Sequence, residues 1–214
     1  MHYACLAGFV AATAFHLYAS LKQEKRKRNI SKPFIILFLL GFYVLAAREV
    51  SLYIVLALAL SWLGDVLLIP KGVKWFTAGG IAFMAGHVFF ILGYLKDVDF
   101  AKIPILAIVL LAALYVGAVT FIFAKLKPHL PKPLFYPMFL YLLINGTMNC
   151  FAIFRCISIG GFAGIITAVG AALFFISDSS LFFVRFDKNS PLKTHFLVML
   201  TYSIGEFLIV WGLL

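Results

Sequence analysis

The chain has 214 residues, of which 64% are hydrophobic and only 12% are charged, and its mean hydropathy is +1.07. These values lie far outside the range of soluble domains, so the composition excludes a soluble globular protein and indicates a membrane protein. The net charge of +10 does not indicate a nucleic-acid partner, because the basic residues lie in short segments between apolar runs.

Eight apolar runs, each near the length that crosses a bilayer, follow one another along the chain. The first lacks the positive region that opens a secretory signal sequence, so we expect it to be retained. No stretch between the runs is longer than a loop, and residues 1–214 are therefore expected to form a single transmembrane helical domain. The runs cover residues 3–21, 33–47, 50–69, 76–95, 104–124, 134–154, 157–184 and 195–214.

The boundary between the second and third runs is the least regular, because the short second run meets Arg48 and Glu49. A seven-span alternative would merge the two runs and place this charged pair in lipid, so we favour eight spans. The basic stretch KQEKRKRNISK at 22–32 is expected to be a loop.

The basic residues are distributed unevenly between alternate connections. Of the 18 Lys and Arg residues, 14 fall in the first, third, fifth and seventh connections and 4, including Arg155, fall in the others. The positive-inside rule then places the odd-numbered connections in the cytosol. The predicted fold is an all-α, polytopic bundle of eight transmembrane helices with both termini on the non-cytosolic side.

Three of the eight acidic residues, Asp65, Asp178 and Glu206, fall within predicted spans. A charged carboxylate at the bilayer centre costs at least about 2.5 kcal/mol, so each marks a candidate functional site. Asp65 precedes Lys71 by six residues and Asp178 precedes Arg185 by seven, which places both about 10 Å inside the cytosolic boundary. Two aspartates at one depth indicate a shared site.

A second polar layer is predicted deeper in the membrane. His87, Asn145 and Glu206 each lie thirteen residues past a lysine of a cytosolic connection, or about 20 Å from that boundary. We expect both layers to face the bundle interior or a wet cavity. Taken singly, His87 can equally be a hydrogen-bonded core residue, and Asn145 and Asn149 can equally join helices.

Two segments share a pattern of glycine, a polar residue, an apolar run and a second glycine: GHVFFILGYL at 86–95 and GEFLIVWGLL at 205–214. Each follows a span that carries an aspartate. The third and fourth spans are therefore candidates for a parallel repeat of the seventh and eighth, with a site where the repeats meet. Chance similarity between apolar segments is the alternative interpretation.

Paired carboxylates share protons and titrate as a unit, which provides a proton donor beside a proton acceptor. This suits a reaction that passes through an oxocarbenium ion, and it equally suits a proton-coupled transporter. Serine hydrolase chemistry is disfavoured because no G-x-S-x-G is present. The histidines and the cysteines Cys5, Cys150 and Cys156 show no metal-ligand spacing, so we expect no metal and no cofactor.

Two specific elements stand out, the GD of LGDVLLI at 63–69 and the SD of ALFFISD at 172–178. Weaker pieces are SKP at 31–33, Phe83 with His87 and Tyr94, Tyr141 with Gly146 and Met148, and TY at 201–202. Through these residues the sequence resembles the YhhN-like lysoplasmalogenases from residue 31 to the last span.

The resemblance implies an eight-helix integral membrane enzyme, expected in a bacterial cytoplasmic membrane, that hydrolyses the vinyl ether bond of lysoplasmalogens. Asp65 and Asp178 match the presumed catalytic aspartates of the family. The residues expected to support them are His87, Asn145, Asn149, Tyr141, Tyr202, Glu206 and Ser177. Glu206 departs from the glutamine that the family usually carries, and its protonated form can mimic that amide. His87 and Asn145 are its nearest candidate partners.

The expected partner is a lysophospholipid within the bilayer, and no motif fixes an oligomeric state. Its head group would lie near the cytosolic boundary, its ether bond at the level of Asp65 and Asp178, and its tail at the deeper polar layer. A proton-coupled transporter or a lipid-binding membrane protein that uses the same buried aspartates is the alternative function.

Overall fold

The computed structural model describes residues 1–190 and 195–214, and within them it contains eight α-helices and no strand. The predicted all-α fold is therefore confirmed. The helices are α1 (His2–Leu21), α2 (Lys25–Ala46), α3 (Leu52–Leu67), α4 (Val73–Leu95), α5 (Ile105–Leu126), α6 (Phe135–Ile159), α7 (Gly161–Phe186) and α8 (His195–Trp211). Three short 3-10 helices, η1 (Phe100–Lys102), η2 (Lys127–His129) and η3 (Lys132–Leu134), lie in the connections.

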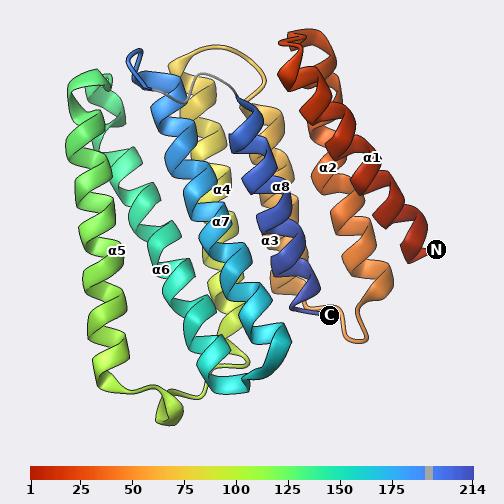
Figure 1. Cartoon of the computed structure of the whole chain (residues 1–214), viewed down its shortest axis with the longest axis vertical. Helices are drawn as coiled ribbons and strands as arrows, with labels where there is room; N and C mark the ends of the chain where they lie inside the picture. The colour runs from red at the N-terminus through yellow and green to blue at the C-terminus, as the bar shows by residue number, and fades with distance from the viewer. Residues whose placement is uncertain (191–194) are drawn as a thin grey trace.

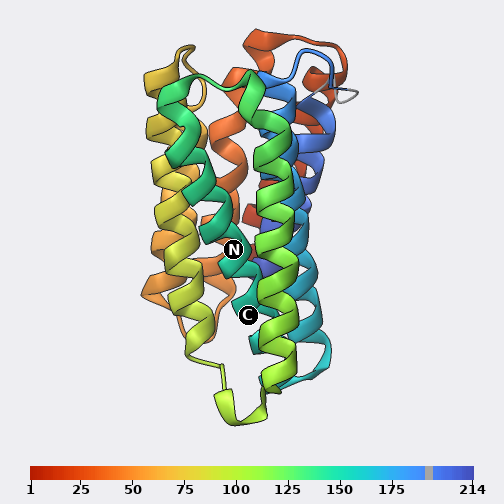
Figure 2. The same cartoon turned by 90° about the vertical axis from the view of Figure 1, so that its left-hand side faces the viewer.

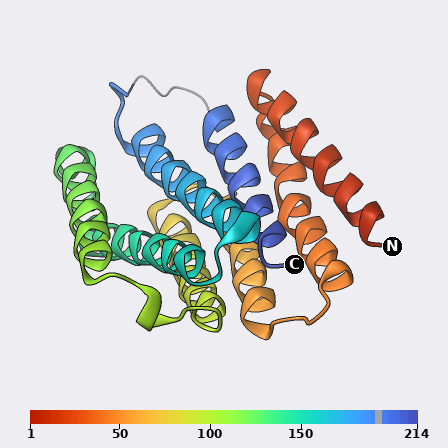
Figure 3. The ribbon, with the colours of Figure 1, turned by 60° about the horizontal axis from the view of Figure 1, so that its bottom comes forward.

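The helices run up and down in two layers (Figure 1). One layer contains α6, α7, α8 and α1, and the other contains α4, α3 and α2 behind them. α5 packs on the outer side of α6, as the side view shows (Figure 2). A view from below separates the two layers and shows α1 and α2 at the edge farthest from α5 (Figure 3).

Six of the helices are long and apolar enough to cross a membrane: α1, α2, α4, α5, α6 and α7. The other two, α3 and α8, are apolar but have only 16 and 17 residues. A helix of that length covers about 25 Å, less than the roughly 30 Å of a hydrocarbon core. The spanning of α3 and α8 therefore stays a prediction, as does the orientation of the termini.

The prediction of a loop over residues 22–32 is wrong, because α2 begins at Lys25 and continues through Pro33. Its first two turns hold the basic run, whose outer side chains Lys25, Arg26 and Lys27 are exposed. Lysine and arginine are good helix formers, so charge alone did not mark a loop here. The extension carries Lys32 into the bundle, where it becomes part of the site described below.

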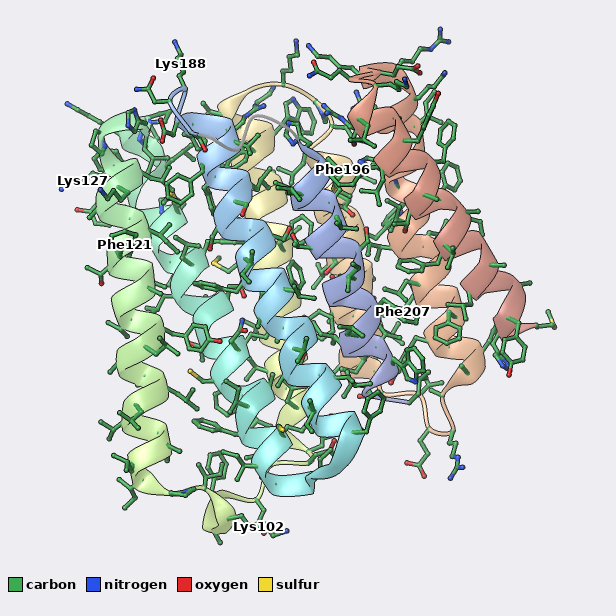
Figure 4. The ribbon with its side chains drawn as sticks, in the orientation of Figure 1. Lys102, Phe121, Lys127, Lys188, Phe196 and Phe207 are labelled. Atoms are coloured by element: carbon green, nitrogen blue, oxygen red, sulfur yellow. The ribbon has the colours of Figure 1, made fainter. Side chains whose placement is uncertain are left out.

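The end of the bundle that holds the connections after α1, α3, α5 and α7 is called the basic end. Figure 4 shows Lys127 and Lys188 at this end and Lys102 at the opposite one. Lys193, which contributes to the predicted charge imbalance, lies outside the described residues.

Arg155 was predicted in a connection, but it lies inside α6 and is buried. Its guanidinium donates to Asp97 at 2.7 Å and to Thr167 of α7 at 2.9 Å. The turn comes later than expected because the glycines at 160 and 161 adopt φ values of 64° and 66°, which favour glycine. Arg155 is therefore a buried ion-paired residue at the end opposite the basic end.

The α3–α4 and α7–α8 hairpins pack through corresponding glycines of the two similar segments. A Cβ atom on Gly86 would lie 3.1 Å from the Ala57 carbonyl oxygen of α3, and one on Gly205 would lie 2.8 Å from the Gly170 carbonyl oxygen of α7. Each glycine thus lets its helix approach the preceding one closely. The next residues, His87 and Glu206, are both fully buried.

Candidate active site

A central cavity of about 120 Å³ lies between the two layers toward the basic end, because its wall is made of residues near the ends of helices that meet there. Side chains of α1, α2, α3, α4, α6, α7 and α8 line it, and both Asp65 and Asp178 are among them. The two aspartates predicted to share a site therefore face one cavity.

The Asp178 carboxyl group is held through one of its two oxygens. Its Oδ2 atom accepts a short hydrogen bond from the Tyr141 hydroxyl and a second from Asn145 Nδ2 at 2.7 Å. Its Oδ1 atom has no hydrogen-bond partner among the described residues and is not sealed from the cavity. Asp178 is therefore fixed in orientation while one oxygen stays available to a bound molecule.

A chain of hydrogen bonds from α5 orients the Asn145 amide. The Tyr115 hydroxyl donates to Asn149 Oδ1 at 3.1 Å, and Asn149 Nδ2 donates to Asn145 Oδ1 at 3.2 Å. Because the Asn145 oxygen already accepts, its nitrogen is directed to Asp178. Asn149 thus acts on the site through Asn145.

Asp65 has a different environment, because both of its oxygens are engaged. Lys32 Nζ lies 3.1 Å from Oδ1, and the Tyr202 hydroxyl donates to Oδ2 at 2.9 Å. Asp65 is therefore an ion-paired carboxylate. Lys32 was not among the site residues predicted from the sequence, although it lies in the SKP element of the family resemblance.

Ser177 and His87 lie beside the site without bonding to either aspartate. The Ser177 hydroxyl lines the cavity but donates to the Val198 carbonyl oxygen at 2.8 Å, which joins α7 to α8. His87 Nε2 is 3.7 Å from Asp178 Oδ2, beyond hydrogen-bond distance, and neither ring nitrogen has a partner in the described chain.

The prediction of a separate deeper layer is wrong for Asn145 and His87, because both approach Asp178. Depth was measured from Lys132, which lies in η3, whereas α6 begins at Phe135. Asn145 is ten residues into α6, or about 15 Å, and Asp178 is eight residues from the end of α7, or about 12 Å. These depths differ by less than one helical turn.

Glu206, like His87, Asn145 and Asn149, does not line the central cavity. Its carboxyl group is fully buried, and neither oxygen has a hydrogen-bond partner in the described chain. Ser61 of α3 faces it without satisfying the geometry of a hydrogen bond. The predicted pairing with His87 or Asn145 is absent among the described residues, since Asn145 is bonded to Asp178 and Asn149.

The cavity wall toward the basic end carries cations that the sequence analysis did not identify. Arg28 of α2 is half-buried and Arg185 of α7 is exposed, with its guanidinium 5.7 Å from the centre of the Phe76 ring. Within the described chain, no carboxylate lies within 4.0 Å of either guanidinium. Both are free to bind an anion.

The described residues contain no group of three or more His, Cys, Asp or Glu side chains arranged to hold a metal ion. The functional groups on the cavity wall include two carboxylates in unlike environments, the hydroxyls of Tyr141 and Tyr202, and the cations Arg28, Lys32 and Arg185.

A helical bundle with long apolar helices and a cavity lined by buried carboxylates defines a membrane protein with an internal polar site. The model of the YhhN family matches residues 27–213, nearly the whole chain, and the protein belongs to this family, which is the lysoplasmalogenase family. Comparison with curated proteins and with solved structures gave no match.

Proposed function

We propose that this protein hydrolyses the vinyl ether bond of lysoplasmalogens to a fatty aldehyde and a glycerophospho-base. Membership of the lysoplasmalogenase family supports this reaction class. The observation that carries the proposal is the contrast between the two carboxyl groups on one cavity wall. Asp178 has an oxygen open to the cavity, whereas Asp65 is held as a carboxylate by Lys32.

Asp178 is the proton donor in this proposal. A vinyl ether is hydrolysed by protonation of its β-carbon, which requires an acid with an unobstructed oxygen, and Oδ1 has no other partner among the described residues. When the proton leaves, the new negative charge is stabilised at Oδ2 by hydrogen bonds from Tyr141 and Asn145.

In this proposal Asp65 stabilises the positive charge that forms during the reaction. Protonation of the β-carbon leaves an oxocarbenium ion, and a carboxylate facing the same cavity stabilises that positive charge. Water then adds to the α-carbon while a carboxylate accepts its proton, and the hemiacetal collapses to aldehyde and alcohol. One water molecule is consumed, and the proton used in the first step is recovered from it.

The cations of the cavity wall suit a lysophospholipid substrate. Arg28 and Arg185 line the cavity without a carboxylate partner in the described chain, and guanidinium groups bind phosphate in bidentate geometry. A phosphate held there leaves the neighbouring glycerol and its ether bond facing the aspartates.

The deciding experiment measures release of fatty aldehyde by purified protein in detergent. Asp178→Asn and Asp65→Asn are each expected to abolish release. Asp178→Asn should leave the protein folded, because neutralising a buried carboxylate without a cationic partner removes a desolvation cost. Asp65→Asn leaves Lys32 without its partner and should lower stability, so its folding is measured alongside its activity. The matched control is Asp99→Asn at the opposite end, where asparagine also caps the short helix η1. This control should retain full activity.

Two results would contradict the proposal in different ways. Near-normal aldehyde release by Asp178→Asn or Asp65→Asn would reject the role of that residue. If the parent protein released no aldehyde, the reaction itself would be rejected, in favour of transport or lipid binding.

A further inference from the structure

A second, smaller cavity opens between α4 and α6 beside the central one, and is called here the lateral groove. It has a volume of about 40 Å³, and its wall includes Ile81 of α4 and Pro137 of α6. Both cavities share four wall residues: Phe76, Gly80, Tyr141 and Phe182. The lateral groove therefore adjoins the central cavity directly.

The lateral groove presents apolar atoms. Its two hydroxyl-bearing side chains are already engaged, because Thr77 donates to the Val73 carbonyl oxygen at 2.9 Å and Tyr141 donates to Asp178. At its outer lip Ile81 is 55% exposed and Pro137 is also exposed, on helices long enough to cross a membrane. The groove thus opens on a surface that suits hydrocarbon.

The central cavity is small for a whole lysolipid. Its volume of about 120 Å³ is below the roughly 300 to 1,000 Å³ of sites for drug-sized ligands. The cavity does not continue deeper into the bundle, because Asn145 and His87 are fully buried there and pack around Asp178. A tail placed at their level would require these polar side chains to lose their packing, which disfavours that placement.

Gly80 marks the junction of the two cavities. It lies inside α4 and lines both cavities, and a Cβ atom placed on it meets no atom within 4 Å. The neighbouring rings pack edge to face, with the Phe182 ring centre 5.8 Å from that of Phe76 and 5.6 Å from that of Tyr141, so they form a continuous aromatic wall of the junction. A side chain added at Gly80 would occupy the junction.

We propose that the hydrocarbon chain of the substrate leaves the central cavity sideways, over Gly80 and between α4 and α6, so that its end lies in the surrounding lipid. This inference rests on the proposed function and adds the path of the chain to it. The occupant is a single alkenyl chain, because the groove is apolar, narrow and continuous with the site that would hold its vinyl ether bond.

The test compares Gly80→Leu with the parent on long-chain and short-chain lysoplasmalogens. Filling the junction should lower the ratio of long-chain to short-chain kcat/KM by at least about tenfold, because only a long chain must pass Gly80. Gly117→Leu on α5 is the matched control, since a Cβ atom there also meets nothing within 4 Å and Gly117 lines neither cavity. Its ratio should equal that of the parent.

The proposed path would be contradicted if active Gly80→Leu protein kept the parent's ratio of long-chain to short-chain kcat/KM, including the case of an equal loss of kcat/KM on both substrates. Absence of aldehyde from the parent would instead reject the proposed function, so the two failures are distinct. If Gly80→Leu fails to fold, the path is tested instead by photolabelling the parent protein with a lysoplasmalogen that carries a photoreactive group in its chain. Labelling of Ile81 or Met138 would support the path, and labelling confined to other helices would overturn it.

Discussion

Lys32 Nζ of α2 lies 3.1 Å from Asp65 Oδ1 of α3, and this ion pair forms part of the wall of the central cavity. The lysine side chain is 17% exposed and the aspartate only 2%. Removing one member of a buried pair is expensive, because the other charge is left without compensation. Lys32 therefore contributes both to stability and to the charge state of Asp65.

Lys32→Met should lower the free energy of unfolding by about 3 kcal/mol, the lower end of the range for buried pairs, because the cavity can hydrate Asp65. The double variant Lys32→Met with Asp65→Asn should regain most of this stability but no activity. Denaturant unfolding in detergent, followed by helical circular dichroism, measures both changes.

The control for this prediction is Lys27→Met, which removes a lysine whose ion pair with Glu24 is exposed. Exposed pairs contribute little, so its stability should equal that of the parent. Equal stability of Lys32→Met and Lys27→Met would show that the pair with Asp65 is not structural.

Arg28 is predicted to bind the phosphate of the substrate. Arg28→Gln should raise KM for a lysoplasmalogen about tenfold, as expected for loss of one hydrogen bond to a charged group. It should leave KM unchanged for an alkenylglycerol, which has no phosphate. Arg26→Gln is the control, because Arg26 lies on the same helical turn but is exposed and lines no part of the cavity. Equal effects on both substrates would contradict a phosphate site.

The sequence identified the two aspartates because a carboxylate within an apolar run stands out against its neighbours. It missed Arg28 and Lys32 because they lie in a run of charges that was assigned to a loop. Their spacing of four residues is the available signal, since such residues share one face of a helix. Arg28 and Lys32 both line the cavity, whereas Lys25, Arg26 and Lys27, which precede them in the same helix, are exposed.

The depth of each polar group was harder to predict. Counting residues from the last lysine assumes that every helix begins at that lysine, and the short helix η3 before α6 breaks this assumption. The partners of Asn145 depend on where α6 crosses α7, which no local pattern records. Helix boundaries and hydrophobic runs are local properties, whereas hydrogen bonds between helices are not.

The orientation of the bundle is tested by chemical labelling. On a background without the three native cysteines, Lys127→Cys and Lys96→Cys place single thiols at exposed positions of opposite ends of the bundle. In intact cells a membrane-impermeant maleimide should label Lys96→Cys and not Lys127→Cys, because the basic end is predicted to face the cytosol. Labelling of both from outside would contradict the spanning topology, and the reverse pattern would contradict its orientation.

Glu206, where the family resemblance implies a glutamine, provides the last prediction. The carboxyl group is fully buried, and in the described chain no Lys, Arg or His nitrogen lies within 4.0 Å of it. A charge without a partner at such a site would be very costly, so the neutral acid is the expected form. Like an amide, a neutral carboxyl group has one donor side and one acceptor side.

Glu206→Gln should therefore be nearly silent. Melting temperature and aldehyde release, compared between variant and parent from about pH 5 to about pH 8, should follow the same profile, because the change alters neither charge nor volume. If Glu206 is instead charged and paired with protonated His87, Glu206→Gln should lower the melting temperature. Loss of the carboxylate would then leave a buried cation and cost about 3 to 5 kcal/mol. Large destabilisation by Glu206→Gln that is relieved by adding His87→Gln would establish that ion pair and reject the neutral form.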